Sequence, residues 1–170
     1  MGRTHVTWSK TRGVYALLAF SFALLWGALM IGAGSTGAVG PQKDIVNGGF
    51  TDHFGERVGL HAESGANGEN PSGHESATRA GDTRYRLKVV CLVVDGNVAA
   101  YGTRVVKSNN PDFPAGTEFV EVVRDGGGPG GEGDGWEIFD VPASTCGDFI
   151  GAAATAPDIL SGNITIRDAS

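Results

Sequence analysis

Apolar and polar positions alternate between Arg84 and Lys107, and this alternation predicts a β-hairpin around which the rest of the chain is organised. In the first half of the stretch every second side chain is apolar, a spacing that places them on one face of a strand. That face carries Tyr85, Leu87, Val89, Cys91 and Val93. The other face begins with basic residues and becomes apolar with Val90, Leu92 and Val94. Asp95-Gly96-Asn97 supplies the turn, so we expect a hairpin that is buried on both faces near its turn.

Shorter runs with the same alternation follow along the chain, separated by glycine, proline and asparagine. They cover residues 56–62, 74–80, 118–124, 136–141 and 163–167. Ile45-Val46 forms a further short run, before a turn expected at Gly48-Gly49. One helical turn is expected around residues 149–153, and long helical runs are absent after residue 40. The pattern predicts an all-β fold: a single antiparallel sandwich or barrel-like domain of about seven to eight short strands.

The first 38 residues have the layout of a secretory signal. Residues 1–12 are polar and positively charged, residues 14–33 are almost wholly apolar, and residues 34–38 are small. The apolar run of about twenty residues is also just long enough to span a bilayer as an uncleaved anchor. A buried core helix is a third alternative. We therefore expect a signal peptide or signal anchor helix at 1–38, a linker and first short strand at 39–55, and the all-β domain at 56–170, outside the cytoplasm.

The charge of the chain is acidic. It has 13 basic and 19 acidic residues, a net charge of −6 at pH 7. Three of the basic residues lie in the first twelve positions, so the chain after residue 38 keeps 10 basic and all 19 acidic residues, a net charge of −9. Because such a domain repels phosphate backbones, we expect no nucleic-acid partner, and contact with a membrane only through the N-terminal segment.

The chain has two cysteines, Cys91 in the first strand of the hairpin and Cys146 in the loop that follows residues 136–141. An even number of cysteines in an exported domain predicts a disulfide between them. Closing a loop of this size stabilises the fold by roughly 4 kcal/mol in the chain-entropy account. The alternative is two separate buried thiols.

Two motifs carry a resemblance to a known group of proteins. The first is Gly-Glu-Asn-Pro-Ser-Gly-His at 68–74, and the second is Val-Cys-Leu-Val-Val-Asp-Gly-Asn-Val-Ala at 90–99, followed by Gly102. With an Asp-Gly loop at 122–126 and a second cysteine at 146, they resemble an uncharacterised group of exported actinobacterial proteins over roughly residues 56–150. The resemblance implies a small all-β domain behind a signal peptide, and it implies no activity. The glycine run at 126–135 is longer than is usual in that group.

The sequence shows no catalytic motif. It lacks the Gly-x-Ser-x-Gly elbow of α/β-hydrolases and the phosphate-binding Walker loop. His53, His61 and His74 have no spacing typical of a zinc site. A pair of catalytic carboxylates cannot be chosen among 19 candidates from sequence alone. We therefore name no catalytic, metal-binding or cofactor-binding residue and expect no cofactor.

Residues 68–74 form the candidate binding loop, with Glu69, Asn70 and His74 as its functional side chains. The glycines allow positive φ angles, and the proline that follows Asn70 favours an extended conformation at Asn70. Two interpretations stay open: a structural corner between two strands, or a binding loop on the rim of the sheet.

The stretch Asp125–Gly135 is acidic and rich in glycine. Its carboxylates Asp125, Glu132 and Asp134 could serve calcium, which prefers oxygen ligands, but the spacing does not match an EF-hand. We expect instead that the flanking strands pair as a hairpin, and that the loop is a mobile connection that binds no metal.

These observations favour an exported, non-enzymatic β-domain in the cell envelope or the extracellular space, where it binds an unidentified partner such as an envelope protein or a glycan. The alternative is a secreted hydrolase with a site in a sheet cleft. A concave pocket with two converging carboxylates, or with a histidine and a carboxylate, would favour the enzyme. A purely structural envelope component is a third hypothesis, to be recognised by a flat surface with an exposed sheet edge or apolar patch.

Overall fold

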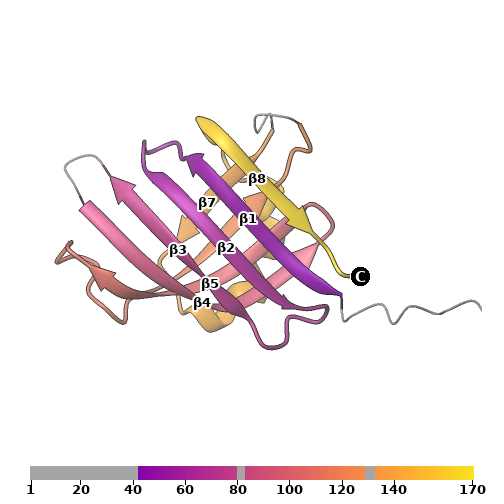
Figure 1. Cartoon of the computed structure of the whole chain (residues 1–170), viewed down its shortest axis with the longest axis horizontal. Helices are drawn as coiled ribbons and strands as arrows, with labels where there is room; N and C mark the ends of the chain where they lie inside the picture. The colour runs from indigo at the N-terminus through magenta and orange to yellow at the C-terminus, as the bar shows by residue number, and fades with distance from the viewer. Residues whose placement is uncertain (1–41, 80–82, 129–132) are drawn as a thin grey trace, which may run out of the picture. The chain divides into compact units, whose positions relative to one another are not determined.

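The computed structural model describes residues 42–79, 83–128 and 133–170 (Figure 1). The predicted signal or anchor segment at 1–38 lies outside these residues. Within the described ranges, no helix is both long and apolar enough to cross a bilayer.

The described residues form eight strands and two short helical segments. The strands are β1 Lys43–Thr51, β2 Arg57–Gly65, β3 Ser72–Arg79, β4 Thr83–Asp95, β5 Val98–Ser108, β6 Glu118–Arg124, β7 Gly135–Phe139 and β8 Ser161–Arg167. The helical segments are the 3-10 helix η1, Ala143–Phe149, and the single turn α1, Ile150–Ala153. The predicted all-β class and strand number are confirmed.

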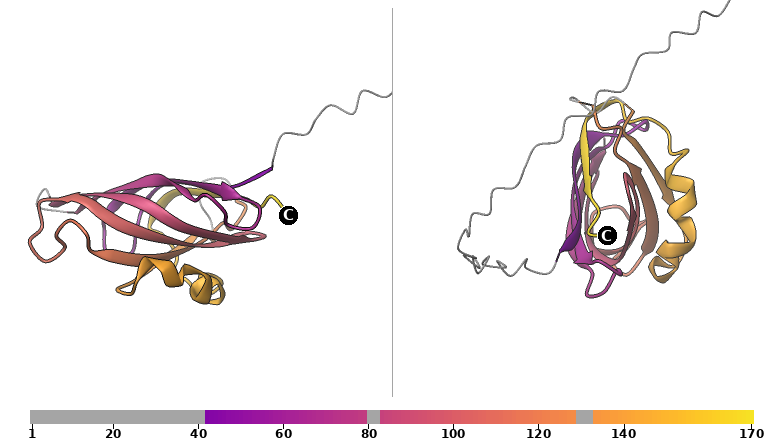
Figure 2. Two further views of the ribbon diagram at one scale, coloured as in Figure 1. Left: turned by 90° about the horizontal axis from the view of Figure 1, so that it is seen from below. Right: turned by 90° about the vertical axis from the view of Figure 1, so that its right-hand side faces the viewer.

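The strands form one antiparallel sheet in the order β7-β6-β5-β4-β3-β2-β1-β8. Each of the first seven strands pairs with its neighbour in sequence, and β8 returns to pair with β1. The sheet curls so that its two halves face each other, with η1 and α1 on the outside (Figure 2). Because the inner faces are apolar, curling buries both against one another, and the fold is a half-barrel.

The hairpin of β4 and β5 has the predicted turn, with Gly96 at a φ of 59°. A bulge at Val90 was not predicted: Val89 faces Thr103, whereas Cys91 faces the next residue, Gly102. The extra residue exchanges the two faces of the strand beyond it. Leu92 therefore joins Tyr85, Leu87 and Val89 in the core, and the prediction that Cys91 and Val93 share that face is wrong.

The bulge turns Cys91 toward η1, where it is bonded to the buried Cys146. The two Cα atoms are 6.2 Å apart, which agrees with the predicted pairing. The bond fastens η1 to the outer face of the sheet. Beside it, a small apolar cluster fills the space between the sheet and the helical segments, built from Ala100, Val122, Ala153 and Ala156.

The turn expected at Gly48-Gly49 is wrong, because both glycines lie inside β1. Gly48 pairs with Leu60 of β2 and with Ile164 of β8, so β1 is an inner strand of the sheet. A Cβ atom at Gly48 would come within 3.1 Å of the Phe50 ring. The glycine therefore serves close packing of a core side chain rather than chain reversal.

Side chains, rather than a further strand, satisfy the free edge of β8. The backbone N–H of Ile164 donates to Asp134 Oδ2 at 2.6 Å, and that of Ile166 donates to Asp125 Oδ2 at 3.0 Å. N–H groups two residues apart point to the same side of a strand, so these are the donors that face away from β1. The β6–β7 loop thus links the two ends of the curled sheet through its carboxylates.

Candidate functional site

A cavity of about 240 Å3 opens inside the half-barrel, near the β1–β2 and β5–β6 loops. Most of its wall is apolar: Phe54, Ala77, Tyr85, Leu87, Phe113, Phe119, Trp136 and Ile138. Four acidic or basic side chains complete it: Glu56, Glu75, Arg79 and Asp140. A mainly apolar wall with a small number of polar side chains is typical of small-molecule sites.

Glu75 and a second glutamate, Glu121, point into the half-barrel. On β3, Glu75 pairs with Leu60 and Leu87, both core residues, and the side chains that flank it in sequence are exposed. On β6, Glu121 lies between Phe119 and Val123, which belong to the same core. Glu75 is 3% exposed and Glu121 is fully buried. Two acidic side chains therefore occupy inward positions that apolar residues would ordinarily fill.

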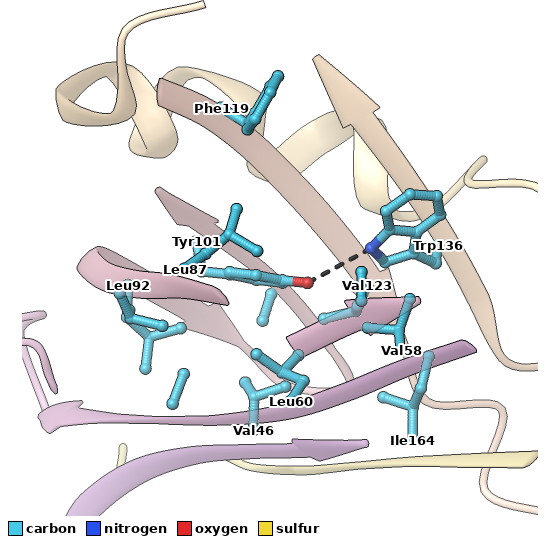
Figure 3. Close-up of a cluster of buried hydrophobic side chains, with 14 of the residues drawn as sticks. Val46, Val58, Leu60, Leu87, Leu92, Tyr101, Phe119, Val123, Trp136 and Ile164 are labelled. Carbon is cyan, nitrogen blue, oxygen red and sulfur yellow. Dashed lines mark hydrogen bonds between the residues drawn. The ribbon is translucent and has the colours of Figure 1, made fainter. Parts of the chain in front are cut away.

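The hydroxyl of Tyr101 on β5 connects the two carboxyl groups. It lies 3.0 Å from Glu75 Oε2 and 2.9 Å from Glu121 Oε2. Thr103 Oγ1 donates to Glu121 Oε1 at 2.8 Å, and the indole Nε1 of Trp136 donates to Glu121 Oε2 at 3.1 Å. The indole is also 3.3 Å from the Tyr101 hydroxyl, as Figure 3 shows. We call Glu75, Tyr101, Thr103, Glu121 and Trp136 the buried network.

The geometry of the network indicates which glutamate carries a proton. Tyr101 has one hydroxyl hydrogen, so it can donate to one carboxyl group only and must accept from the other. Glu121 already accepts from Thr103 and Trp136, which suits a carboxylate. Tyr101 therefore donates to ionised Glu121, and the single proton of Glu75 is shared between the Tyr101 hydroxyl and the Glu121 carboxylate.

Electrostatics leads to the same assignment. Burial raises the pKa of Glu75 well above its usual value, and the neighbouring Glu121 charge raises it further. Burial also raises the pKa of Glu121, but the hydrogen bonds from Glu75, Thr103, Tyr101 and Trp136 oppose this change. These shifts agree with the hydrogen-bond geometry, which gives the proton to Glu75 and the negative charge to Glu121.

The mouth of the cavity carries an ion pair and an exposed aromatic ring. Arg79 pairs with Glu56. Burial raises the pKa of Glu56, and the Arg79 charge opposes this shift without cancelling it. Asp52, in the β1–β2 turn, accepts hydrogen bonds from the backbone N–H groups of Phe54 and Glu56, both at 2.8 Å. The buried Asp52 therefore positions two residues of the cavity wall, and Phe54 remains 57% exposed.

The predicted binding loop does not form one cluster. Glu69 and Asn70 lie in the β2–β3 loop, where Glu69 Oε2 accepts from the backbone N–H of Asn67 at 2.8 Å. Asn70 has a φ of 52°, so the expectation of an extended Asn70 is wrong; asparagine is among the few residues that adopt this conformation readily. His74 lies apart from them on the outer face of β3, opposite His61 of β2.

The acidic glycine-rich loop confirms one prediction and adds a role. Strands β6 and β7 pair as the expected hairpin. Asp134 accepts from the backbone N–H of Gly126 as well as Ile164, and Asp125 accepts from Gly127 as well as Ile166. Glu132 lies outside the described residues. In the part of the chain that the structure describes, no group of three or more His, Cys, Asp or Glu side chains is placed to hold a metal ion.

The buried network was missed at the level of sequence. Its one visible signal is Glu121, an acidic residue at an inward position of a strand whose two faces are both buried. Glu75 gave no such signal, because the polar run around it resembles a solvent-exposed strand.

Comparison of the chain with protein-family models, with curated proteins and with solved structures found no match in any of the three. The resemblance to exported actinobacterial proteins therefore stays a prediction.

Proposed function

We propose that this chain is an exported binding protein whose ligand is a small, mostly apolar molecule held in the half-barrel cavity. The observation that carries the proposal is the apolar cavity of about 240 Å3 with Glu75 of the buried network in its wall. Burying ionisable groups costs stability, and a core of the same volume built from apolar side chains would avoid that cost. Perturbed carboxyl groups beside a cavity are accordingly a mark of functional sites.

Two features support export. Residues 1–38 have the order of a secretory signal. Cys91 and Cys146 are paired, and disulfides persist mainly in oxidising compartments.

Filling the cavity tests the proposal. In Ala77→Phe the new ring enters the cavity, whereas in the matched variant Ser76→Phe the ring lies on the exposed outer face of the same strand. Small aromatic probes from benzene to naphthalene are titrated while the indole N–H signal of Trp136 is followed by NMR. We expect the signal to shift in the native protein and in Ser76→Phe, and Ala77→Phe to weaken binding by about tenfold or more. Equal binding by both variants would place the site elsewhere.

A secreted hydrolase is the second candidate function. The observation that favours it is the Glu75–Glu121 pair, because a protonated acid beside a carboxylate is an arrangement used in acid–base catalysis. Binding is the better supported function, since Glu121 is fully buried and its oxygens accept hydrogen bonds from neighbours. Turnover of chromogenic esters or glycosides that is lost in Glu75→Gln would reverse this preference.

A further inference from the structure

We propose that the cavity selects small organic cations: molecules with an apolar or aromatic body and one protonated amine, which points toward Glu75. The proposal rests on the proposed binding function and names the chemical class of its ligand.

The direction of the hydrogen bonds around Glu75 favours a ligand that donates. The proton of Glu75 is directed into the network, toward Tyr101 and Glu121. What Glu75 offers to the cavity is therefore oxygen lone pairs, which accept hydrogen bonds and donate none. A ligand that binds at this end of the cavity must donate, as an ammonium group does with three N–H bonds.

The charge of the cavity wall also favours a cation. The network holds one negative charge, and Glu56 and Asp140 add acidic groups to the wall. Among the described lining residues the basic side chain is Arg79, which is already paired with Glu56. An anion entering this space would be repelled, whereas an ammonium group would be attracted. The net charge of −9 that the chain carries after residue 38 adds long-range attraction for cations.

The aromatic side chains of the wall favour a ligand with an apolar or aromatic body. Five aromatic side chains line the cavity: Phe54, Tyr85, Phe113, Phe119 and Trp136. Their rings provide apolar area for the body of the ligand, and an aromatic face attracts a cation that lies over it. Apolar walls, an acidic end and aromatic rings together fit an arylalkylamine better than a sugar or a fatty acid.

Three probes with similar bodies test the inference by isothermal titration calorimetry of the purified protein at neutral pH: 2-phenylethylamine, 2-phenylethanol and phenylacetate. The expected result is binding of the amine at least about tenfold tighter than that of the alcohol, with the carboxylate weakest. Repeating the amine titration in buffers of different ionisation enthalpy measures proton exchange. We expect release of up to about one proton, because an ammonium group beside Glu75 favours its ionised form.

Glu75→Gln and Glu63→Gln form a matched pair of variants. Glu63 lies on the neighbouring strand β2, where it pairs with Lys43 on the surface. We expect Glu75→Gln to remove the preference of the cavity for the amine over the alcohol, and Glu63→Gln to retain it. If Glu75→Gln does not fold, the ratio of the two affinities and the proton release in the native protein decide the question.

The possible failures are distinguishable. Two results would overturn cation selection and leave the binding function standing. One is that the alcohol binds as tightly as the amine. The other is that the amine binds without proton release and with equal affinity in Glu75→Gln. Failure of all three probes to bind would contradict the binding function itself.

Discussion

The hydroxyl of Tyr101 lies between two buried glutamates that come from strands on different sides of the half-barrel. Its single hydrogen forces the two carboxyl groups into unlike protonation states, so one residue determines the charge of the whole network. The cost of burying the acids is reduced by hydrogen bonds that Thr103 and Trp136 donate to Glu121 and not to Glu75. Glu75 remains neutral and faces the cavity.

This assignment predicts an unusual dependence of stability on pH. Because the pKa of Glu75 is raised in the folded protein, the unfolded chain releases this proton first, and the contribution of Glu75 to stability falls as the pH rises above its unfolded pKa. Relative to Glu75→Gln, the native protein should lose up to about 1.4 kcal/mol of unfolding free energy per pH unit once the pH exceeds the unfolded pKa of a glutamate, until the pH reaches the raised pKa of folded Glu75. Urea unfolding at several pH values measures this difference.

The comparison with Glu75→Gln removes the contributions of acids whose pKa is shifted elsewhere. Glu63 and Glu118, whose pKa values are lowered by Lys43 and Arg104, contribute equally to both proteins. A stability difference that stays constant over this pH range would show that Glu75 is ionised in the folded protein.

Among individual residues, the sequence predicted the Cys91–Cys146 pair but not the buried network. Two cysteines allow a single intramolecular pairing, so no geometry was needed. Tyr101 and Glu121 face each other on the adjacent strands β5 and β6, but Glu75 comes from β3, and its meeting with them depends on how far the sheet curls. Alternation along a single strand carries no information about curvature.

Among the elements, the β6–β7 loop closes the edge of β8 with carboxylates. Replacing buried Asp134 by alanine leaves the N–H groups of Gly126 and Ile164 without this acceptor. We expect Asp134→Ala to lower the unfolding free energy by about 1–3 kcal/mol, the cost of one unsatisfied buried group, because the Ile164 N–H is buried whereas Gly126 is exposed and water can replace its acceptor. Chemical denaturation measures the loss, and hydrogen exchange should show faster exchange at Ile164.

Asp148→Ala is the matched control, because Asp148 is an exposed aspartate in η1. It should change stability by less than about 0.5 kcal/mol. If Asp134→Ala is as stable as this control, the carboxylates do not hold the edge of β8, and the acidic loop is only the mobile connection that the sequence predicted.

The elements themselves were largely predictable from alternation and turn residues. The β4–β5 and β6–β7 hairpins are both as expected. The bulge at Val90 was not, because a run that is apolar on both faces reads the same in either register. Gly48-Gly49 was misinterpreted as a turn for a related reason: a glycine that accommodates the Phe50 ring looks in sequence like a glycine that reverses the chain.

At the level of the whole domain, the sequence left a sandwich and a barrel-like fold both open, and the described residues form a single curled sheet whose halves enclose the cavity. We propose an exported location from the order of residues 1–38 and from the disulfide. We propose that this cavity is a ligand site with Glu75 at its polar end.

A crystal structure of the protein with 2-phenylethylamine tests that claim most directly. We expect the ring of the ligand among Phe113, Phe119 and Trp136, and its nitrogen about 3 Å from a carboxyl oxygen of Glu75. A cavity filled by its own side chains, or a ligand bound outside the half-barrel with the cavity empty, would contradict the account.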